Sequence, residues 1–439
     1  MIRGEKVRFD IHNILFSIYK FNNTLENTSI KKIIDRHKKE DVSFIFNVSL
    51  NSMRLHIHIL KILKIYIKKK LRDHERILLI SAITQIVFLN FKEYAVINCS
   101  VEISKKLKLY PALINATLKA IAKDKKKLKH IKISYNDLPQ WFKKRTTSLT
   151  IYEKNQFLEN FYKEPDVHIV FKNKEKLNEF DEGLIKTSST SGFLLNKKEI
   201  EGKKSFIKGD WWVQDFSSFF PINNIQFRNQ DLKLLDACAA PGGKAFQLLS
   251  KNLKVTLNDK SKRRIQTLKS NLNRLKFNPK VINKDFIKFD NNEKFDFIII
   301  DAPCSAIGTI RKNPEIFFKS KIPDFDGLNN LQQNMLEKAA LLLNAGGNIL
   351  YITCSFIKNE TFDQINEFIK KNSNFLVENF ILTEENYDFS KLLKNNLMIT
   401  FPDKILNNSI DGYFAAYSDL QSFILPAIDS AEKPPNIIE

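Results

Sequence analysis

Residues 234–244 read Leu-Leu-Asp-Ala-Cys-Ala-Ala-Pro-Gly-Gly-Lys, an apolar run that enters a Gly-Gly turn. This pattern predicts a strand, a tight turn and a helix that begins directly after the turn. Gly242 and Gly243 have no Cβ, so a ligand can come close to the backbone, and the helix N-terminus offers N–H groups without helical partners. The stretch therefore predicts a nucleotide-type pocket, although an ordinary strand-to-helix turn would explain the two glycines alone.

An acidic residue follows the next predicted strand. Asp259 comes directly after the strand predicted at residues 254–258. In doubly wound α/β sheets, an acidic residue at this place accepts hydrogen bonds from the ribose of an adenosine-containing cofactor. The fingerprint Gly-x-Gly-x-x-Gly is absent from the turn, so the pattern does not indicate an NAD site.

From residue 209 onward, strand and helix patterns alternate, which predicts an α/β domain with a doubly wound, Rossmann-like parallel sheet. We expect strands at 233–236, 254–258, 280–283, 295–300, 348–353, 375–381 and 413–417. We expect helices between them at 243–251, 261–275, 328–344 and 359–371. Because such sheets bind ligands outside the carboxyl ends of their strands, functional residues should follow those ends.

Polar or reactive residues follow five of these strands in succession, which packing needs alone do not explain. They are Asp236 and Cys238, Asp259, Asp285, Asp301 with Cys304, and Thr353-Cys354-Ser355. Asp285 is placed to read an adenine amino group or, equally, to cap the helical turn after it. Most free cysteines are buried and inert, but Cys304 and Cys354 both follow strands into loops, where a thiol is accessible. Two thiols at one pocket suggest thiol chemistry, and no His in either motif forms a protease-like dyad.

The positive charge of the chain is concentrated near its N-terminus. Of 439 residues, 70 are Lys or Arg and 49 are Asp or Glu, which gives a net charge of +21. Residues 1–135 hold 28 basic and 11 acidic residues, or +17, and the remaining 42 and 38 give +4. This excess favours a polyanionic partner such as RNA, although a Lys-rich surface produced by codon bias is the alternative. The length indicates two or three domains.

Apolar residues recur at helical spacing from Val7 to Ala122, with no competing strand alternation. Asp73 is a candidate N-cap for a helix that begins near His74, and Pro111 fits the first turn of a later helix. These patterns predict an all-helical domain. Its apolar pattern at 72–107 and 111–124 resembles the NusB family, an RNA-binding helical fold.

The Lys-rich stretch 124–132 indicates a domain boundary. Residues 134–209 mix short helix and strand patterns, which fits either a small α/β module with RNA contacts or a plain linking subdomain. We therefore expect an all-helical NusB-like domain at 1–130, a linker and small α/β subdomain at 131–208, a Rossmann-like α/β domain at 209–418, and a disordered tail at 419–439.

Several protein classes are disfavoured by the composition. The four cysteines, Cys99, Cys238, Cys304 and Cys354, form no Cys-x-x-Cys pair, so zinc is not indicated, and no secretory leader opens the chain. Charges interrupt every apolar run before the ~18 residues that a membrane span needs. We expect a soluble, cytoplasmic, monomeric protein without metal.

The motifs of the C-terminal half resemble the NOL1/NOP2/Sun family of S-adenosylmethionine-dependent RNA cytosine-5 methyltransferases. The resemblance rests on residues 236–244, Asn258-Asp259, Asp285, Asp-Ala-Pro-Cys-Ser at 301–305, Arg-Lys-Asn-Pro-Glu at 311–315, 353–355 and Asn359-Glu360, with 211–215 and 411–414 also fitting. Ala245 departs from the usual Thr. Together with a NusB-like domain, the pattern is similar to family members that modify bacterial 16S rRNA, which implies an RNA substrate met before full subunit assembly.

The resemblance also implies the residues that bind the cofactor. These are Cys238, Ala239, Ala240, Pro241, Gly242, Gly243, Lys244, Asp259, Asp285 and Asp301. It further implies that Cys354 attacks C6 of the cytosine, that Cys304 assists product release, that Asp301 holds protonated N3, and that Lys244 lies near the ring.

The chemistry explains why a thiol is needed. Cytosine C5 is a poor nucleophile until a thiolate adds to C6, after which C5 can take the sulfonium methyl group. Sequence spacing alone does not say which thiol attacks, because DNA cytosine-5 methyltransferases use the Pro-Cys thiol. Two other functions stay open. The first is methylation of tRNA or another rRNA site. The second is a non-catalytic RNA-binding or antitermination-type factor, and only this second function is disfavoured by the intact Asp259, Asp301, Cys304 and Cys354.

Overall fold

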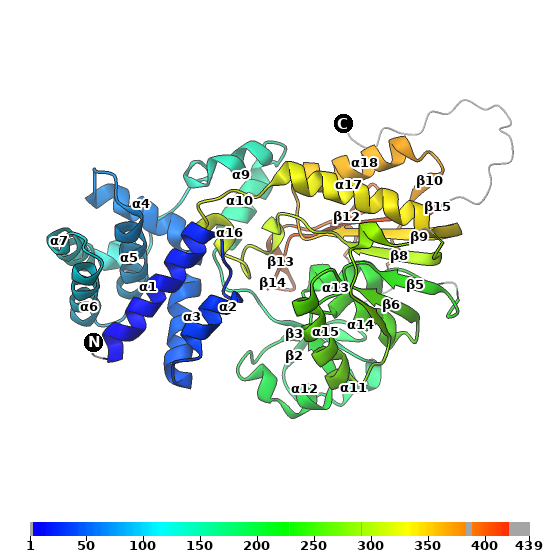
Figure 1. Ribbon diagram of the computed structural model, residues 1–439, viewed down its shortest axis with the longest axis horizontal. Coiled ribbons are helices and arrows are strands. Elements are labelled where there is room, and N and C mark those ends of the chain that lie inside the picture. Colours follow the sequence, from blue (N-terminus) through cyan, green and yellow to red (C-terminus); the bar gives the residue numbers. More distant parts are fainter. Residues whose placement is uncertain (1–2, 228, 291, 383–388, 421–439) are drawn as a thin grey trace. The chain divides into compact units, whose positions relative to one another are not determined.

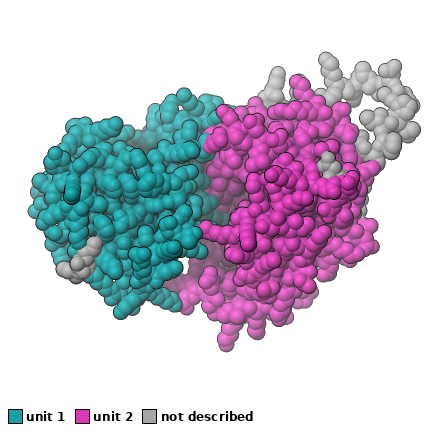
Figure 2. Space-filling model, in the orientation of Figure 1, with its two compact units in different colours: residues 1–164, 310–323 teal, residues 165–309, 324–439 magenta. Residues whose placement is uncertain are grey.

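The computed structural model describes residues 3–227, 229–290, 292–382 and 389–420. The chain forms two compact units, shown in different colours in Figure 2. Unit 1 contains residues 1–164 and 310–323, and unit 2 contains residues 165–309 and 324–439. None of the described helices is both long enough and apolar enough to cross a membrane.

Unit 1 is all-helical, as predicted. Its helices are α1 (Arg3–Phe21), α2 (Thr28–Ile34), α3 (Lys39–Arg54), α4 (His56–Tyr66), α5 (Asp73–Ile83), α6 (Glu93–Lys106), α7 (Pro111–Lys123), α8 (Lys125–Leu128), α9 (Gln140–Arg145), α10 (Ile151–Asn160) and α16 (Glu315–Phe318), with short η1 (Thr84–Phe88) and η2 (Tyr135–Asp137). The residues at helical spacing in α1, such as Ile11, Ile14 and Ile18, are fully buried in one core. Pro111 occupies the first turn of α7, as predicted.

The predicted N-cap of α5 was wrong by one residue. The cap is Arg72, whose backbone N–H donates to Glu75 Oε2 at 2.9 Å. Because Glu75 satisfies this N–H, the helix already includes Asp73 in its first turn, where a negative charge is favourable.

Unit 1 extends beyond the predicted boundary at residue 130 and also takes in part of the predicted α/β domain. Phe317 packs against the rings of Phe142, Phe157 and Phe161, the first two from α9 and α10. Phe318 is 3% exposed and lies in the core of the N-terminal helices. Aromatic burial therefore holds residues 310–323 on the helical unit.

Unit 2 begins with a four-stranded antiparallel sheet in the order β2-β3-β1-β4. Its strands are β1 (His168–Phe171), β2 (Leu184–Ser188), β3 (Ser191–Leu194) and β4 (Trp211–Val213), accompanied by α11 (Lys174–Asn178), η3 (Ile200–Gly202) and α12 (Lys204–Lys208). A small α/β module therefore exists where the sequence indicated one.

The main sheet of unit 2 runs in the order β11-β12-β15-β9-β8-β5-β6-β7, with β10 also paired to β15. Its strands are β5 (Lys233–Asp236), β6 (Lys254–Asn258), β7 (Lys280–Ile282), β8 (Phe295–Asp301), β9 (Leu343–Thr353), β10 (Phe375–Glu378), β11 (Leu393–Lys394), β12 (Leu397–Ile399) and β15 (Phe414–Leu420). A separate hairpin joins β13 (Asp403–Ile405) to β14 (Asn408–Ile410).

The doubly wound fold is confirmed, but the sheet is mixed and not wholly parallel. Strands β5 to β9 are parallel, whereas β15 pairs antiparallel with β9, β10 and β12. An antiparallel strand needs no crossover helix, and none separates β14 from β15. The tail predicted at 419–439 begins inside β15, and its residues 421–439 lie outside the described part.

Helices cover both faces of this sheet (Figure 1). One face packs on α13 (Phe216–Asn223), α14 (Gly243–Ser250) and α15 (Lys262–Leu275), and the other packs on α17 (Phe325–Leu342) and α18 (Phe362–Lys371). The strand order reverses between β5 and β8, from which β6 and β7 extend one way and β9 the other. A ligand crevice is expected at this reversal, outside the carboxyl ends of the strands.

Candidate active site

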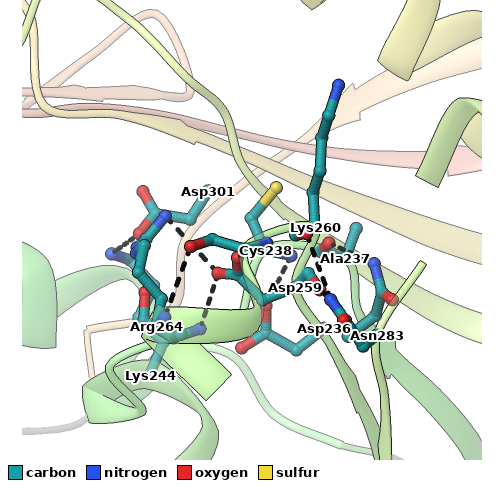
Figure 3. A network of polar contacts seen from close by, with 12 residues as sticks. Asp236, Ala237, Cys238, Lys244, Asp259, Lys260, Arg264, Asn283 and Asp301 are labelled. Atoms are coloured by element: carbon teal, nitrogen blue, oxygen red, sulfur yellow. Dashed lines mark hydrogen bonds and ion pairs between the residues drawn. The ribbon is translucent and has the colours of Figure 1, made fainter. Parts of the chain in front are cut away.

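Charged residues from β8 and α14 meet at this edge of the sheet (Figure 3). Lys244, in the first turn of α14, is buried, and its Nζ lies 2.7 Å from Asp301 Oδ2 at the end of β8. The same ammonium group lies 5.4 Å from the centre of the Tyr413 ring. The structure therefore brings together Lys244 and Asp301, two residues predicted from the sequence. Tyr413, which was not predicted as a functional residue, lies beside this pair.

Asp236 ends β5 as predicted and has an unusual environment. It is 1% exposed; its Oδ1 accepts from the Cys238 N–H at 3.3 Å, and its Oδ2 has no hydrogen-bond partner among the described residues. Burial, and then the charge of Asp301, raise the pKa of Asp236 to about 7, while Lys244 opposes the shift. A buried carboxylate oxygen without a partner fits a ligand that brings a hydrogen-bond donor or a positive charge.

We expect Asp236→Asn to stabilise the cofactor-free protein more at pH 8 than at pH 5. The folded state raises the pKa from 3.8 to about 7, so it binds more protons than the unfolded state and loses stability as pH rises through this range. The loss relative to a neutral side chain is about 4 kcal/mol at pH 8 and about 1.5 kcal/mol at pH 5. Urea unfolding of both proteins should show the gain at pH 8 exceeding that at pH 5 by about 3 kcal/mol. An equal gain at the two pH values would contradict the raised pKa.

Asp259 lies directly after β6 and holds the backbone of the Ala-Ala-Pro segment. Its Oδ2 accepts a hydrogen bond from the Ala240 N–H at 3.3 Å and lies 3.4 Å from Nη1 of Arg264. Nη2 of Arg264 donates to the Ala240 carbonyl. Its Oδ1 accepts from the Ser261 N–H at 2.8 Å. Arg264 was not among the predicted site residues, although its place one turn into the helix after Asp259 could have indicated an ion pair with that carboxylate. The carboxylate is thus oriented by α15 and the turn, and its contact with a ribose stays a prediction.

Contacts within the protein are a sufficient reason for both glycines, and the approach of a ligand to their backbone stays a prediction. A Cβ on Gly242, which has a φ of +123°, would lie 1.9 Å from the Phe246 ring, and one on Gly243 would lie 3.3 Å from the Gln214 side chain. Neighbouring side chains of the same unit therefore occupy the space beside both glycines. The positive φ at Gly242 also requires a residue without a Cβ.

Cys238 and Asp285 also lie at this edge. Burial, followed by the charge of Asp236, raises the pKa of the Cys238 thiol, so this cysteine is neutral. Asp285 caps the turn η4 (Phe286–Lys288) by accepting from the Ile287 N–H at 3.3 Å. Its other oxygen lies 3.0 Å from Lys260 Nζ, and this hydrogen bond lowers its pKa. The capping role is confirmed, whereas adenine recognition stays a prediction.

The two thiols named from the sequence face each other. Cys304 follows β8 and Cys354 follows β9; both are partly exposed, and their Sγ atoms lie 3.3 Å apart. The hydrogen bond to Cys354, followed by burial, raises the pKa of Cys304. Burial, and then the charges of Cys354 and Asp301, raise the pKa of Tyr413, which places this ring near both the thiol pair and the Lys244–Asp301 pair.

Known proteins resemble both the helical and the α/β part of this chain. A family model described as 16S rRNA methyltransferase RsmB/F matches residues 223–418, and a NusB family model matches residues 7–123. Ribosomal RNA small subunit methyltransferase B of Shewanella oneidensis is 28% identical over 343 residues, covering 73% of this chain and 79% of that protein. The protein of the same name from Vibrio vulnificus is 25% identical, covering 83% and 91%.

A solved structure shows the same fold over most of the chain. The crystal structure of PH0851 superposes with a TM-score of 0.68 at 20% identity, and the alignment covers 95% of this chain and 99% of that one. The family models match the helical region and the α/β region separately, in the order that the motifs predicted. Residues 223–418 therefore belong to the 16S rRNA methyltransferase RsmB/F family of S-adenosylmethionine-dependent enzymes, and residues 7–123 form a NusB family domain that precedes them in the chain.

Proposed function

We propose that this protein forms 5-methylcytosine in 16S rRNA through a covalent bond between Cys354 and C6 of the target cytosine. The observation that carries the proposal is the Cys304–Cys354 pair, 3.3 Å apart at the ends of adjacent parallel strands. The resemblance of the motifs to the family implies the attacking role for Cys354, and the raised pKa of Cys304 is compatible with a thiol that does not attack first. The names of the relatives support the small-subunit RNA as substrate.

The residues present fit S-adenosylmethionine, which supplies an electrophilic methyl group on a positively charged sulfur. Asp236, Asp259, Asp285 and Asp301 line the strand ends, and the unpartnered oxygen of Asp236 suits a cationic or hydrogen-bond-donating ligand. Asp259 and Asp285 would hold the ribose and the adenine. Residues 238–244 would form the wall of this pocket.

The protein's side chains would then drive the reaction in a fixed order. The Cys354 thiolate adds to C6, and the C5–C6 electron pair makes C5 nucleophilic enough to take the methyl group. Asp301, held by Lys244 at 2.7 Å, would bind protonated N3 and stabilise the charge that develops on the ring. A base or solvent water would then take the C5 proton, so that the C–H electron pair re-forms the C5–C6 double bond and the Cys354 sulfur leaves as a thiolate, a step that Cys304 would assist. The base must leave its stack to enter, which single-stranded RNA allows at low cost.

Bisulfite sequencing tests the substrate directly. Total RNA from cells that lack the protein, complemented with wild type or with Cys354→Ala, should show one 16S cytosine that is protected only by the wild type. Protection of a tRNA or another rRNA position would move the proposal to that substrate. Methylation of purified 16S rRNA but not of assembled small subunits would support action before full assembly. Restored protection with Cys354→Ala would reject the mechanism.

A basic groove on unit 1 is where we expect RNA phosphates to bind. Its walls come from α4, residues 67–72, α5 and η2, and they include the cations Lys61, Lys64, Lys69, Lys70 and Arg76 beside a single acid, Asp137. The aromatic ring of Tyr110 is 64% exposed and lies 5.4 Å from Lys69 Nζ. Cations beside an exposed ring are the features that bind a single-stranded backbone and a base.

Replacing Lys64, Lys69 and Lys70 with Ala should weaken RNA binding and flatten its salt dependence. Each lost phosphate contact on a single strand reduces the slope of log K against log salt by about 0.7, so three contacts give about 2. The control replaces Lys31, Lys32 and Lys39, exposed residues of the same unit that do not line the groove. Fluorescence titrations at salt concentrations between about 50 and 300 mM measure both slopes. Equal slopes in the two triple variants would show that the charge is only a solvated surface.

A further inference from the structure

A buried carboxylate connects the two loops that carry the thiols. Glu360 lies in η6 (Lys358–Glu360), after β9, and is fully buried. Its Oε1 accepts from the backbone N–H of Ser305, and its Oε2 accepts from the hydroxyl groups of Ser305 and Ser355, each at 2.6 Å. One side chain therefore receives three short hydrogen bonds from two loops.

The donors are the immediate neighbours of the thiols. Ser305 follows Cys304 and Ser355 follows Cys354, and these loops leave the adjacent parallel strands β8 and β9. The backbone N–H of Gly308 also donates to the Cys354 carbonyl at 3.0 Å, so the loops meet at a second point. Glu360 receives three hydrogen bonds from these loops, more than this single backbone contact, so its side chain is the main connection.

The neighbouring structure holds Glu360 in place. The Tyr351 hydroxyl, on β9, donates to the Glu360 carbonyl at 3.0 Å. Thr361, the next residue, donates its hydroxyl to the Ile357 carbonyl at 3.0 Å. The carboxylate is thus anchored to β9 independently of the two serines, and it can set the position of the loops.

We propose that Glu360 is a positioning residue that sets the separation of the Cys304 and Cys354 sulfurs for the two thiol steps of the reaction. The effect of Glu360 on methylation rests on the proposed function, whereas its effect on the distance between the two sulfurs does not. The carboxylate acts on the two thiol loops through its hydrogen bonds to Ser305 and Ser355. A shift of about 1 Å in a reacting group can cost on the order of 100-fold in rate, so the connection matters for catalysis even though it lies behind the thiols.

The test uses disulfide formation as a measure of the distance between the sulfurs. Diamide takes one hydrogen from each thiol and is reduced to the hydrazine, while the two sulfurs form one S–S bond. In the wild type, sulfurs 3.3 Å apart should join rapidly, and mass spectrometry of the linked peptides measures the initial rate. This readout needs neither RNA nor cofactor, so it holds even if the proposed methylation fails.

Ser355→Ala removes one hydrogen bond to the carboxylate, and Glu360→Gln keeps its volume but not its charge. We expect disulfide formation to slow about 10-fold or more in Ser355→Ala and less in Glu360→Gln, and kcat for methylation to fall about 10-fold to 100-fold while KM for RNA stays within about 2-fold. Ser191→Ala is the control, since Ser191 is also buried and bonded to Thr187 and Ser188 at 2.8 Å, outside the thiol loops. It should leave both rates unchanged.

The melting temperatures of the variants separate positioning from folding. If Ser355→Ala melts well below Ser191→Ala, Glu360→Gln becomes the deciding variant, because it leaves no cavity. A wild-type rate of disulfide formation in a folded variant would overturn the proposal, whether or not methylation fell. Slower disulfide formation with unchanged kcat would overturn its catalytic part. If the wild type itself methylates no RNA while the disulfide rates still differ, the proposed function fails and the positioning of the sulfurs stands.

Discussion

Cys354→Ala is expected to abolish methylation and to form no covalent complex with RNA, whereas Cys304→Ala should form the complex and retain it. Without the Cys354 sulfur, no bond to C6 can form and C5 stays unreactive. Without Cys304, addition and methyl transfer can still occur, but the release of the sulfur is impaired. The two sulfurs lie 3.3 Å apart, so either could reach a base placed between the loops, and only the variants separate their roles.

A denaturing gel with labelled RNA and S-adenosylmethionine measures this outcome. A shifted band should accumulate with Cys304→Ala and be absent from Cys354→Ala. Cys99→Ala is the control, because Cys99 lies on α6 in the helical unit and should behave as the wild type. The reverse pattern would exchange the two roles, and no band in any variant under turnover conditions would contradict the covalent mechanism.

Phe318→Ala should destabilise the helical unit by about 3–5 kcal/mol, although Phe318 lies within the region that the methyltransferase family model matches. Its ring is 3% exposed and packs against Tyr19 and His56, with centroid distances of 5.9 and 5.6 Å. The backbone N–H of Ser320 donates to the Tyr19 carbonyl at 3.0 Å, which fixes the segment beside α1. Removal of the ring leaves a cavity that this anchored segment cannot close.

Urea unfolding of the full chain, followed by hydrogen exchange of peptides from α1 and α3, localises the loss. Exchange in these helices should accelerate, while peptides of β5 and β6 keep their protection. Phe21→Ala is the control, since the Phe21 side chain is 67% exposed and its loss should change stability by less than about 0.5 kcal/mol. If Phe318→Ala matched this control, residues 310–323 would not belong to the core of unit 1.

The sequence by itself determined the local elements and the residues at their ends. The strands predicted at 233–236 and 254–258 have the same bounds in the structure, because alternation of apolar residues and turn signals act over a few residues. Asp236, Asp301 and the thiols then fall at one edge, since the carboxyl ends of parallel strands meet there. The family's motifs are likewise short and contiguous, so their chemistry could be named before the fold was known.

Only the tertiary structure decided the features that depend on contacts between distant residues. The antiparallel direction of β15 follows from its pairing with β9, for which no local pattern in either strand is specific. The assignment of residues 310–323 to the helical unit follows from the burial of Phe317 and Phe318 among helices far earlier in the chain. The hydroxyl of Ser320, for example, donates to the carbonyl of Tyr19, 301 residues earlier. The 3.3 Å sulfur separation and its hydrogen-bonded support by Glu360 arise where two strand ends and a buried carboxylate meet, and such distances are set by packing in three dimensions.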